Sequence, residues 1–116
     1  MVDKIRPEWA HVEARRASRA RPDTGSRTLA QHARRAASAS PDRVAFIEDS
    51  TQTTFEQVFE RAQRLVRGLR ELGVQPGEVV SFQLPNWTEA AVISLATAIG
   101  GWICNPIVPI YREAEL

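Results

Sequence analysis

The sequence lacks the signatures of several large classes of protein. It has one cysteine, Cys104, so it cannot form an internal disulfide, and a free thiol suits a reducing cytoplasm. No apolar run approaches the ~20 residues that a membrane-spanning helix needs. The motifs GxGxxG, GxxxxGKS/T, GxSxG, HExxH and CxxC are all missing, so the residues alone identify no catalytic, cofactor-binding or metal-binding side chain.

The chain as a whole also lacks a large excess of positive or negative charge. Its 116 residues carry 15 basic and 14 acidic side chains, which predicts no general attraction to nucleic acid or to a membrane surface. The distribution is uneven, because ten basic and five acidic residues precede position 44. With 43% hydrophobic residues, the chain can still bury a core.

Residues 1–25 contain few large apolar side chains, and we predict a loosely ordered basic lead-in there. Its arginines are compatible with a targeting peptide, an arm for an acidic partner, or a solvated helix. Asp3, Glu8 and Glu13 argue against a transit peptide, which is usually poor in acidic residues. We favour the solvated helix over the other two interpretations, because runs of charged residues usually face water.

A βαβ crossover is predicted for residues 79–106. Residues 79–84 resemble a strand covered on both faces, and Pro85 ends it. Asn86 is placed to cap a helix together with Glu89, and that helix runs toward Gly100-Gly101 before a second strand. Because parallel strands need such a crossover, the pattern predicts an α/β fold.

The segment before the crossover predicts two further helices and a hairpin. Residues 26–38 form the first helix, and residues 44–47 and 52–54 pair as short strands. Thr54 opens a longer helix, with Gln57 at the capping-box position, and Gly73 ends it. The helix has an apolar stripe that must be buried, made of Phe55, Val58, Phe59, Ala62, Leu65, Val66, Leu69 and Leu72.

Four side chains, His32, Cys104, Tyr111 and Arg112, are candidates for a role in ligand binding. His32 is predicted to be a packed or partly exposed side chain rather than a metal ligand, since His11 is the one other histidine. Cys104 is predicted to be structural, because no neighbouring base is suggested. Tyr111 and Arg112 would lie at the carboxyl end of a strand, where open α/β sheets bind ligands, although a plain loop is the simpler interpretation.

The order of three segments resembles the start of an adenylate-forming enzyme of the acyl-CoA synthetase and AMP-dependent ligase family. They are Pro41-Asp42-Arg43-Val44-Ala45, then Thr53-Thr54-Phe55 with Val58, then Leu69-Arg70-Glu71-Leu72-Gly73-Val74-Gln75-Pro76-Gly77-Glu78-Val79-Val80. The chain departs from the family pattern with Phe55 for tyrosine, Val58 for leucine and Glu78 for aspartate, and each substitution keeps the physical role. Residues 84–89 and 105–116 are similar to a narrower branch, the cyclohexanecarboxylate-CoA ligases and related acid-CoA ligases.

The resemblance covers about residues 28–116 and implies a ligase that uses ATP, Mg and CoA to activate a small-molecule carboxylic acid. In the family, the phosphate-binding loop, the adenosine-binding residues and the catalytic lysine lie downstream of position 116, so no site residue can be carried over. The resemblance also implies that the turn at residues 85–87 is scaffold rather than a ligand site.

Residues 112–116 start a helical pattern that stops after barely one turn, so we expect residues 26–116 to be an incomplete part of the ligase domain. We further expect this piece to be inactive by itself and prone to self-association. The alternative function is a small non-enzymatic binding module that uses the arginine-rich amino-terminal arm. A complete flavodoxin-like regulator is a weaker alternative, because too few parallel strands are predicted.

Overall fold

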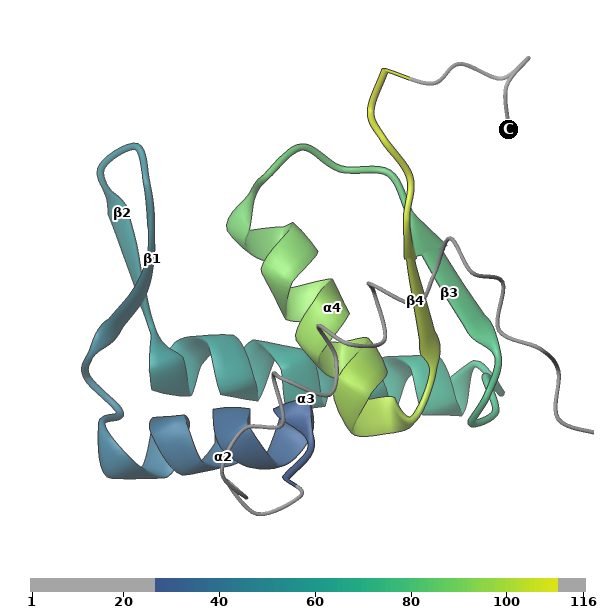
Figure 1. The fold of residues 1–116 in the computed structure, drawn as a ribbon, viewed down its shortest axis with the longest axis horizontal. Coiled ribbons are helices and arrows are strands. Elements are labelled where there is room, and N and C mark those ends of the chain that lie inside the picture. Colours follow the sequence, from purple (N-terminus) through teal and green to yellow (C-terminus); the bar gives the residue numbers. More distant parts are fainter. Residues whose placement is uncertain (1–26, 111–116) are drawn as a thin grey trace, which may run out of the picture.

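The computed structural model describes residues 27–110, which form three helices and two small sheets (Figure 1). The elements follow in the order α2 (Leu29–Ala39), β1 (Val44–Glu48), β2 (Thr51–Thr54), α3 (Phe55–Glu71), β3 (Val79–Phe82), α4 (Thr88–Gly100) and β4 (Ile103–Pro106). The predicted lead-in at residues 1–25, and Tyr111 and Arg112, lie outside the described residues.

Capping boxes start the first two helices. In α2, the backbone N–H of Gln31 donates to Thr28 Oγ1, and the backbone N–H of Thr28 donates to Gln31 Oε1 at 2.9 Å. The helix therefore begins at Leu29, and the predicted start at residue 26 is wrong. Thr54 and Gln57 form the same pair of bonds at the start of α3, as predicted. Each box satisfies two backbone donors that a helix end would otherwise leave unpaired.

The predicted hairpin is confirmed, and its strands are one residue longer than expected. β1 and β2 pair antiparallel with Glu48 opposite Thr51, so Asp49 and Ser50 make a two-residue turn. Asp49 adopts a φ of 51°, in the left-handed region that aspartate tolerates better than most residues. The second strand, β2, leads directly into the amino end of α3.

The apolar stripe of α3 is buried over most of its length, as predicted. Val58, Ala62 and Val66 are buried, and Phe59, Leu65 and Leu69 pack against them. Leu72 is the exception, because it is 82% exposed. It is the residue after the last helical one, where the chain turns through Gly73 at a φ of 91°. Its side chain therefore leaves the buried face.

The βαβ crossover is confirmed, since β3 and β4 pair in parallel, with Val79 opposite Ile103 and Phe82 opposite Pro106. Two details of the prediction are wrong. The first strand ends at Phe82 rather than at residue 84, and burial alternates along it, with Val79 56% exposed and Val80 half-buried. The described helices cover one face of this two-stranded sheet, so alternate side chains point away from them.

Asn86 does not cap α4, which is a further correction to the prediction. The residue that precedes the helix is Trp87, and its side chain makes no capping hydrogen bond. The backbone N–H of Trp87 donates to the Pro85 carbonyl at 2.7 Å, so the turn places Trp87 rather than Asn86 at the helix boundary. An indole has no acceptor, and a carboxylate from another element supplies the cap instead.

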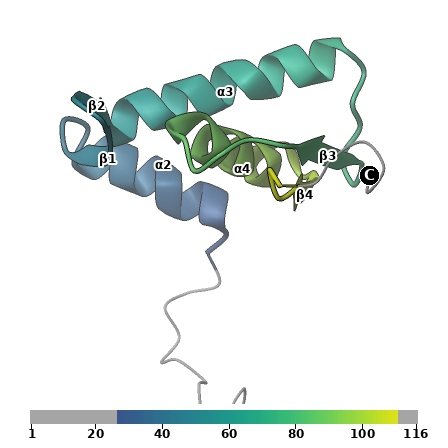
Figure 2. The same cartoon turned by 90° about the horizontal axis from the view of Figure 1, so that it is seen from above.

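The core lies where α3 crosses α4, with α2 against both helices (Figure 2). It consists of Val58, Ala62, Val66, Val92, Leu95, Ala96 and Trp102. Trp102 follows α4 directly and is 7% exposed. Its ring lies against Gly100 so closely that a Cβ atom at that position would overlap the indole. The small residues of α4 thus let a large aromatic side chain close the core.

Candidate functional site

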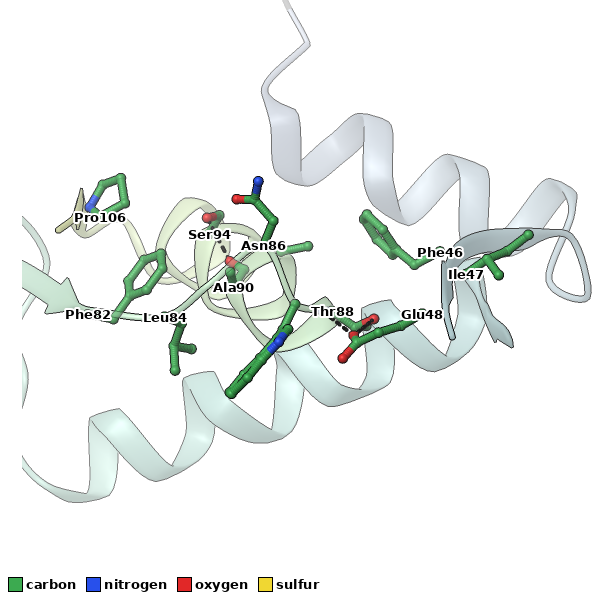
Figure 3. A pocket seen from close by; sticks show the side chains of 12 residues that line it. Phe46, Ile47, Glu48, Phe82, Leu84, Asn86, Thr88, Ala90, Ser94 and Pro106 are labelled. Atoms are coloured by element: carbon green, nitrogen blue, oxygen red, sulfur yellow. Dashed lines mark hydrogen bonds between the residues drawn. The ribbon is translucent and has the colours of Figure 1, made fainter. Parts of the chain in front are cut away.

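The carboxyl ends of β3 and β4 lie at the same edge of the parallel sheet, next to the amino end of α4 (Figure 1). Open α/β sheets place ligands at this kind of edge. A cavity of about 370 Å³ is found there (Figure 3). Its lining comes from β1, from β3 and the segment that follows it, from α4 and from β4. The lining residues are Phe46, Ile47, Glu48, Phe82, Leu84, Asn86, Trp87, Thr88, Ala90, Ala91, Ser94 and Pro106.

Apolar side chains enter this cavity from opposite sides (Figure 3). Phe46 and Ile47 come from β1, and Phe82, Leu84 and Pro106 come from the parallel sheet and the segment after β3. Phe46 is exposed in spite of its size, so it presents apolar surface to whatever occupies the cavity, whereas the Ile47 side chain points away from the other lining residues (Figure 3). The cavity can therefore hold an apolar group, and its polar atoms cluster at the amino end of α4.

Glu48 is the cap of α4, although it belongs to β1. Its Oε2 accepts a hydrogen bond from the Thr88 backbone N–H at 2.9 Å and a second from Thr88 Oγ1 at 3.0 Å. A carboxylate is favourable at this position, because the first backbone N–H groups of a helix are unpaired and carry partial positive charge. The bond joins the hairpin to the crossover across 40 positions of sequence. Sequence patterns did not identify Glu48, since no local spacing links it to Thr88.

An ion pair lies next to this cap. Arg61 of α3 and Glu89 of α4 approach to 2.7 Å between the Arg61 guanidinium and Glu89 Oε1. The hydrogen bond from Arg61 lowers the pKa of the Glu89 carboxyl below its ordinary value, and a backbone hydrogen bond at Glu89 lowers it further. The two side chains also line a polar cavity of about 260 Å³ together with Glu48 and Asp49.

Ser94 and Cys104 make the other polar contact near the edge. Ser94 Oγ donates to the Ala90 carbonyl at 2.8 Å, and the Cys104 thiol lies 3.7 Å from Ser94 Oγ. Cys104 is exposed on β4. Its contact is a hydroxyl rather than a base, so this pair does not form the nucleophile and base arrangement of covalent catalysis.

His32 lies on α2 and lines an apolar cavity of about 440 Å³ between α2, β1, α3 and α4. The residue is exposed although it lines this cavity, so of the two predicted placements, packed or partly exposed, it is closer to the exposed one. Within residues 27–110, no three histidine, cysteine, aspartate or glutamate side chains gather in a way that could hold a metal ion. No helix in that part of the chain is long and apolar enough to cross a membrane.

The turn at the strand edge lacks the features of a loop that binds ATP phosphates. Binding of ATP phosphates calls for a glycine-rich loop with converging N–H groups and a cation, and the turn at residues 85–87 has no glycine and no lysine. We therefore assign no reaction step to residues 27–110. Their chemistry at the strand edge is that of a capped helix beside an apolar cavity.

Comparison with known proteins decides the family. The model of the AMP-binding enzyme family matches residues 33–116. The chain belongs to that family. It is 34% identical over 93 residues to the medium-chain fatty-acid–CoA ligase of Escherichia coli. The aligned region covers 79% of this chain and 16% of that protein.

Solved structures show the same architecture in other members of the family. A structure of a long-chain-fatty-acid CoA ligase from Rhodopseudomonas palustris is similar over 74% of this chain and 22% of that one, with a TM-score of 0.70 and 35% identity. The NpsA amino-terminal subdomain of Klebsiella oxytoca, at 22% identity and a TM-score of 0.71, shows the fold over 75% of this chain and 23% of that one. The fold is thus that of the amino-terminal subdomain of adenylate-forming ligases, as predicted, and the chain spans less than a quarter of these relatives.

Proposed function

We propose that this AMP-binding family chain is the amino-terminal part of a carboxylic acid–CoA ligase. The observation that carries the proposal is the family match over residues 33–116. The 34% identity to a bacterial fatty-acid–CoA ligase supports it. The reaction would join ATP, an acid and CoA to give acyl-CoA, AMP and pyrophosphate. In its first step the carboxylate attacks the α-phosphate to form an acyl-adenylate, and the CoA thiolate then displaces AMP.

In this proposal, residues 26–116 provide scaffold for the nucleotide-binding part of the domain, and residues 1–25 precede it as a basic lead-in. The α3–α4 core and the parallel β3–β4 pair supply a fixed edge on which further elements can be built. ATP, Mg and CoA would be held by residues outside 27–110, since the described residues carry no phosphate loop. We accordingly propose that residues 1–116 form no acyl-adenylate by themselves.

The proposed acids are small aliphatic or alicyclic carboxylates, because residues 84–89 and 105–116 resemble the cyclohexanecarboxylate-CoA ligase branch. The exposed free thiol of Cys104 fits the reducing cytoplasm in which we expect the enzyme to work. Self-association of residues 1–116 stays a prediction, and the exposed Ile47, Val79 and Ile103 side chains support it.

Two measurements test the proposal. First, pyrophosphate release from Mg-ATP is measured with residues 1–116, using octanoate and cyclohexanecarboxylate. We expect no release above that of the buffer, and clear release would overturn the scaffold role. Second, the DNA that follows codon 116 is read, and any longer polypeptide it encodes is assayed by mass spectrometry for acyl-CoA.

The second measurement tests the ligase itself. Formation of an acyl-CoA by the longer polypeptide supports the proposal. A stop codon directly after position 116, or a longer polypeptide that forms adenylates but transfers no acyl group to CoA, contradicts it. The latter result would indicate an adenylating enzyme that uses another acceptor.

A further inference from the structure

A groove of about 480 Å³ lies among the three helices, away from the strand edge. α4 lies between α2 and α3 in Figure 2, and one residue of α2, four of α3 and one of α4 line the groove. These residues are Arg34, Gln63, Val66, Arg67, Arg70 and Ile99. None of them lines the cavity at the ends of β3 and β4, so the two sites are separate.

Every charged residue that lines this groove is an arginine. Within residues 27–110, Arg34, Arg67 and Arg70 have no ion-pair or hydrogen-bond partner for their guanidinium groups. The polar cavity of about 330 Å³ on the other side of α3 differs, because Glu60 shares its lining with Arg61 and Arg64. The groove thus has three arginines and no carboxylate in its lining, and none of the three arginines forms an ion pair within residues 27–110.

Helix-end electrostatics account for only one of these arginines. A cation in the last turn of a helix is favourable beside the unpaired carbonyl groups, and Arg70 occupies that turn of α3. α2 has no basic residue in its last turn, so Arg34 gains nothing from such an effect, and Arg67 lies before the last turn of α3. Three like charges around one concavity repel one another, and a bound anion would remove that repulsion.

We propose that this groove binds an organic phosphate. Guanidinium groups offer planar, paired N–H donors that match phosphate oxygens, and arginines from two helices can contact one phosphate chain from both sides. Val66 is buried at the base of the groove and Ile99 is half-buried, so the non-phosphate part of the ligand has apolar surface to lie on. The Gln63 amide supplies both a donor and an acceptor. The volume lies in the range of small-molecule sites.

The experiment titrates the 116-residue chain with ADP, inorganic pyrophosphate and adenosine, and follows binding by calorimetry in a buffer of low ionic strength. ADP is a suitable probe because it carries the proposed chemistry and cannot support acyl-adenylate formation. We expect ADP to bind most tightly, pyrophosphate to bind several-fold more weakly, and adenosine to show no measurable heat. Adenosine binding as tightly as ADP would overturn the proposal, because the arginines would then be irrelevant.

A variant with all three groove arginines replaced, R34Q/R67Q/R70Q, should bind ADP at least ~10-fold more weakly, since each charge-assisted hydrogen bond to phosphate contributes strongly. These side chains are exposed, so we expect the variant to keep the helical circular dichroism of the original chain. The single variant R67Q should show a smaller loss in the same direction.

The matched control is R35Q/R43Q/R64Q, which loses the same net charge at exposed positions that do not line the groove. It should bind ADP within ~2-fold of the original chain at fixed salt. Equal weakening in the two triple variants would show nonspecific attraction and overturn the proposal, as would the failure of ADP to bind the folded original chain. This outcome is independent of the ligase proposal, because no catalysis is measured.

Discussion

The carboxylate of Glu48 caps α4 through Thr88, although the two residues belong to different units of the fold. Glu48 Oε2 lies 2.9 Å from the Thr88 nitrogen and 3.0 Å from Thr88 Oγ1 (Figure 3). Thr88 is buried, at 7% exposure, so its hydroxyl needs this partner. The contact fixes the β1–β2 hairpin against the helix that follows β3, and with it one wall of the cavity at the strand edge.

Replacing Glu48 with alanine should lower the free energy of unfolding by about 1–2 kcal/mol, because the helix loses its cap and a buried hydroxyl loses its acceptor. Glu48→Gln keeps a side-chain oxygen and should lose less. Urea denaturation measures both. Glu60→Ala, at an exposed glutamate of α3, is the control and should stay within about 0.5 kcal/mol of the original chain. Equal losses at the two positions would contradict the cap.

The contact of Gly100 with Trp102 predicts a steric effect of a single methyl group. Gly100→Ala should destabilise the chain by about 1–3 kcal/mol, because the new Cβ overlaps the buried indole and forces the core to shift. Gly68→Ala is the matched control, since it is also a helical glycine and no atom lies within 4 Å of its added Cβ. That variant should gain about 0.5–1 kcal/mol from better helix propensity. Thermal unfolding of both variants tests this prediction. If Gly100→Ala is as stable as the original chain, the packing argument is wrong.

The Arg61–Glu89 ion pair should make a contribution to stability that depends on pH. Arg61 holds the pKa of Glu89 below its ordinary value of 4.5 in the folded chain. A depressed carboxyl pKa stabilises the folded state above the unfolded pKa, and the contribution is lost as the pH falls through the folded value. Glu89→Gln should therefore flatten the pH dependence of stability below pH 4.5 and leave little difference at the acid end. Denaturation at a series of pH values tests this, and an unchanged profile would count against the ion pair.

Loss of the capping box should destabilise the first turn of α3. Thr54→Ala removes the Oγ1 acceptor for the Gln57 N–H and should lower the free energy of unfolding by about 1 kcal/mol. Thr54→Ser keeps the acceptor and serves as the conservative control, with a smaller change expected. Hydrogen exchange of the amides in the first turn of α3 should accelerate in the alanine variant only. Identical protection in the two variants would show that packing, rather than the cap, holds this turn.

The sequence by itself determined the elements whose information is local. Thr54 and Gln57 are three residues apart, so their reciprocal bonds and the stripe of Val58, Ala62 and Val66 were readable as a helix with one buried face. The hairpin and the βαβ crossover followed in the same way, since short apolar runs and turn residues specify them. The ordered segments that resemble adenylate-forming ligases are local too, and the family was therefore predictable.

Tertiary structure decided everything that joins distant parts of the chain. Asn86 had the right spacing from Glu89 to cap α4, yet the turn put Trp87 at the boundary and Glu48 supplied the oxygen from another strand. The spacing of Arg34, Arg67 and Arg70 indicated no site, because only the packing of α2 and α3 with α4 brings them around one groove. Helix periodicity fixes which side chains share a face of one helix, whereas only packing fixes which faces meet. For that reason the cap and the groove could not be found by spacing alone.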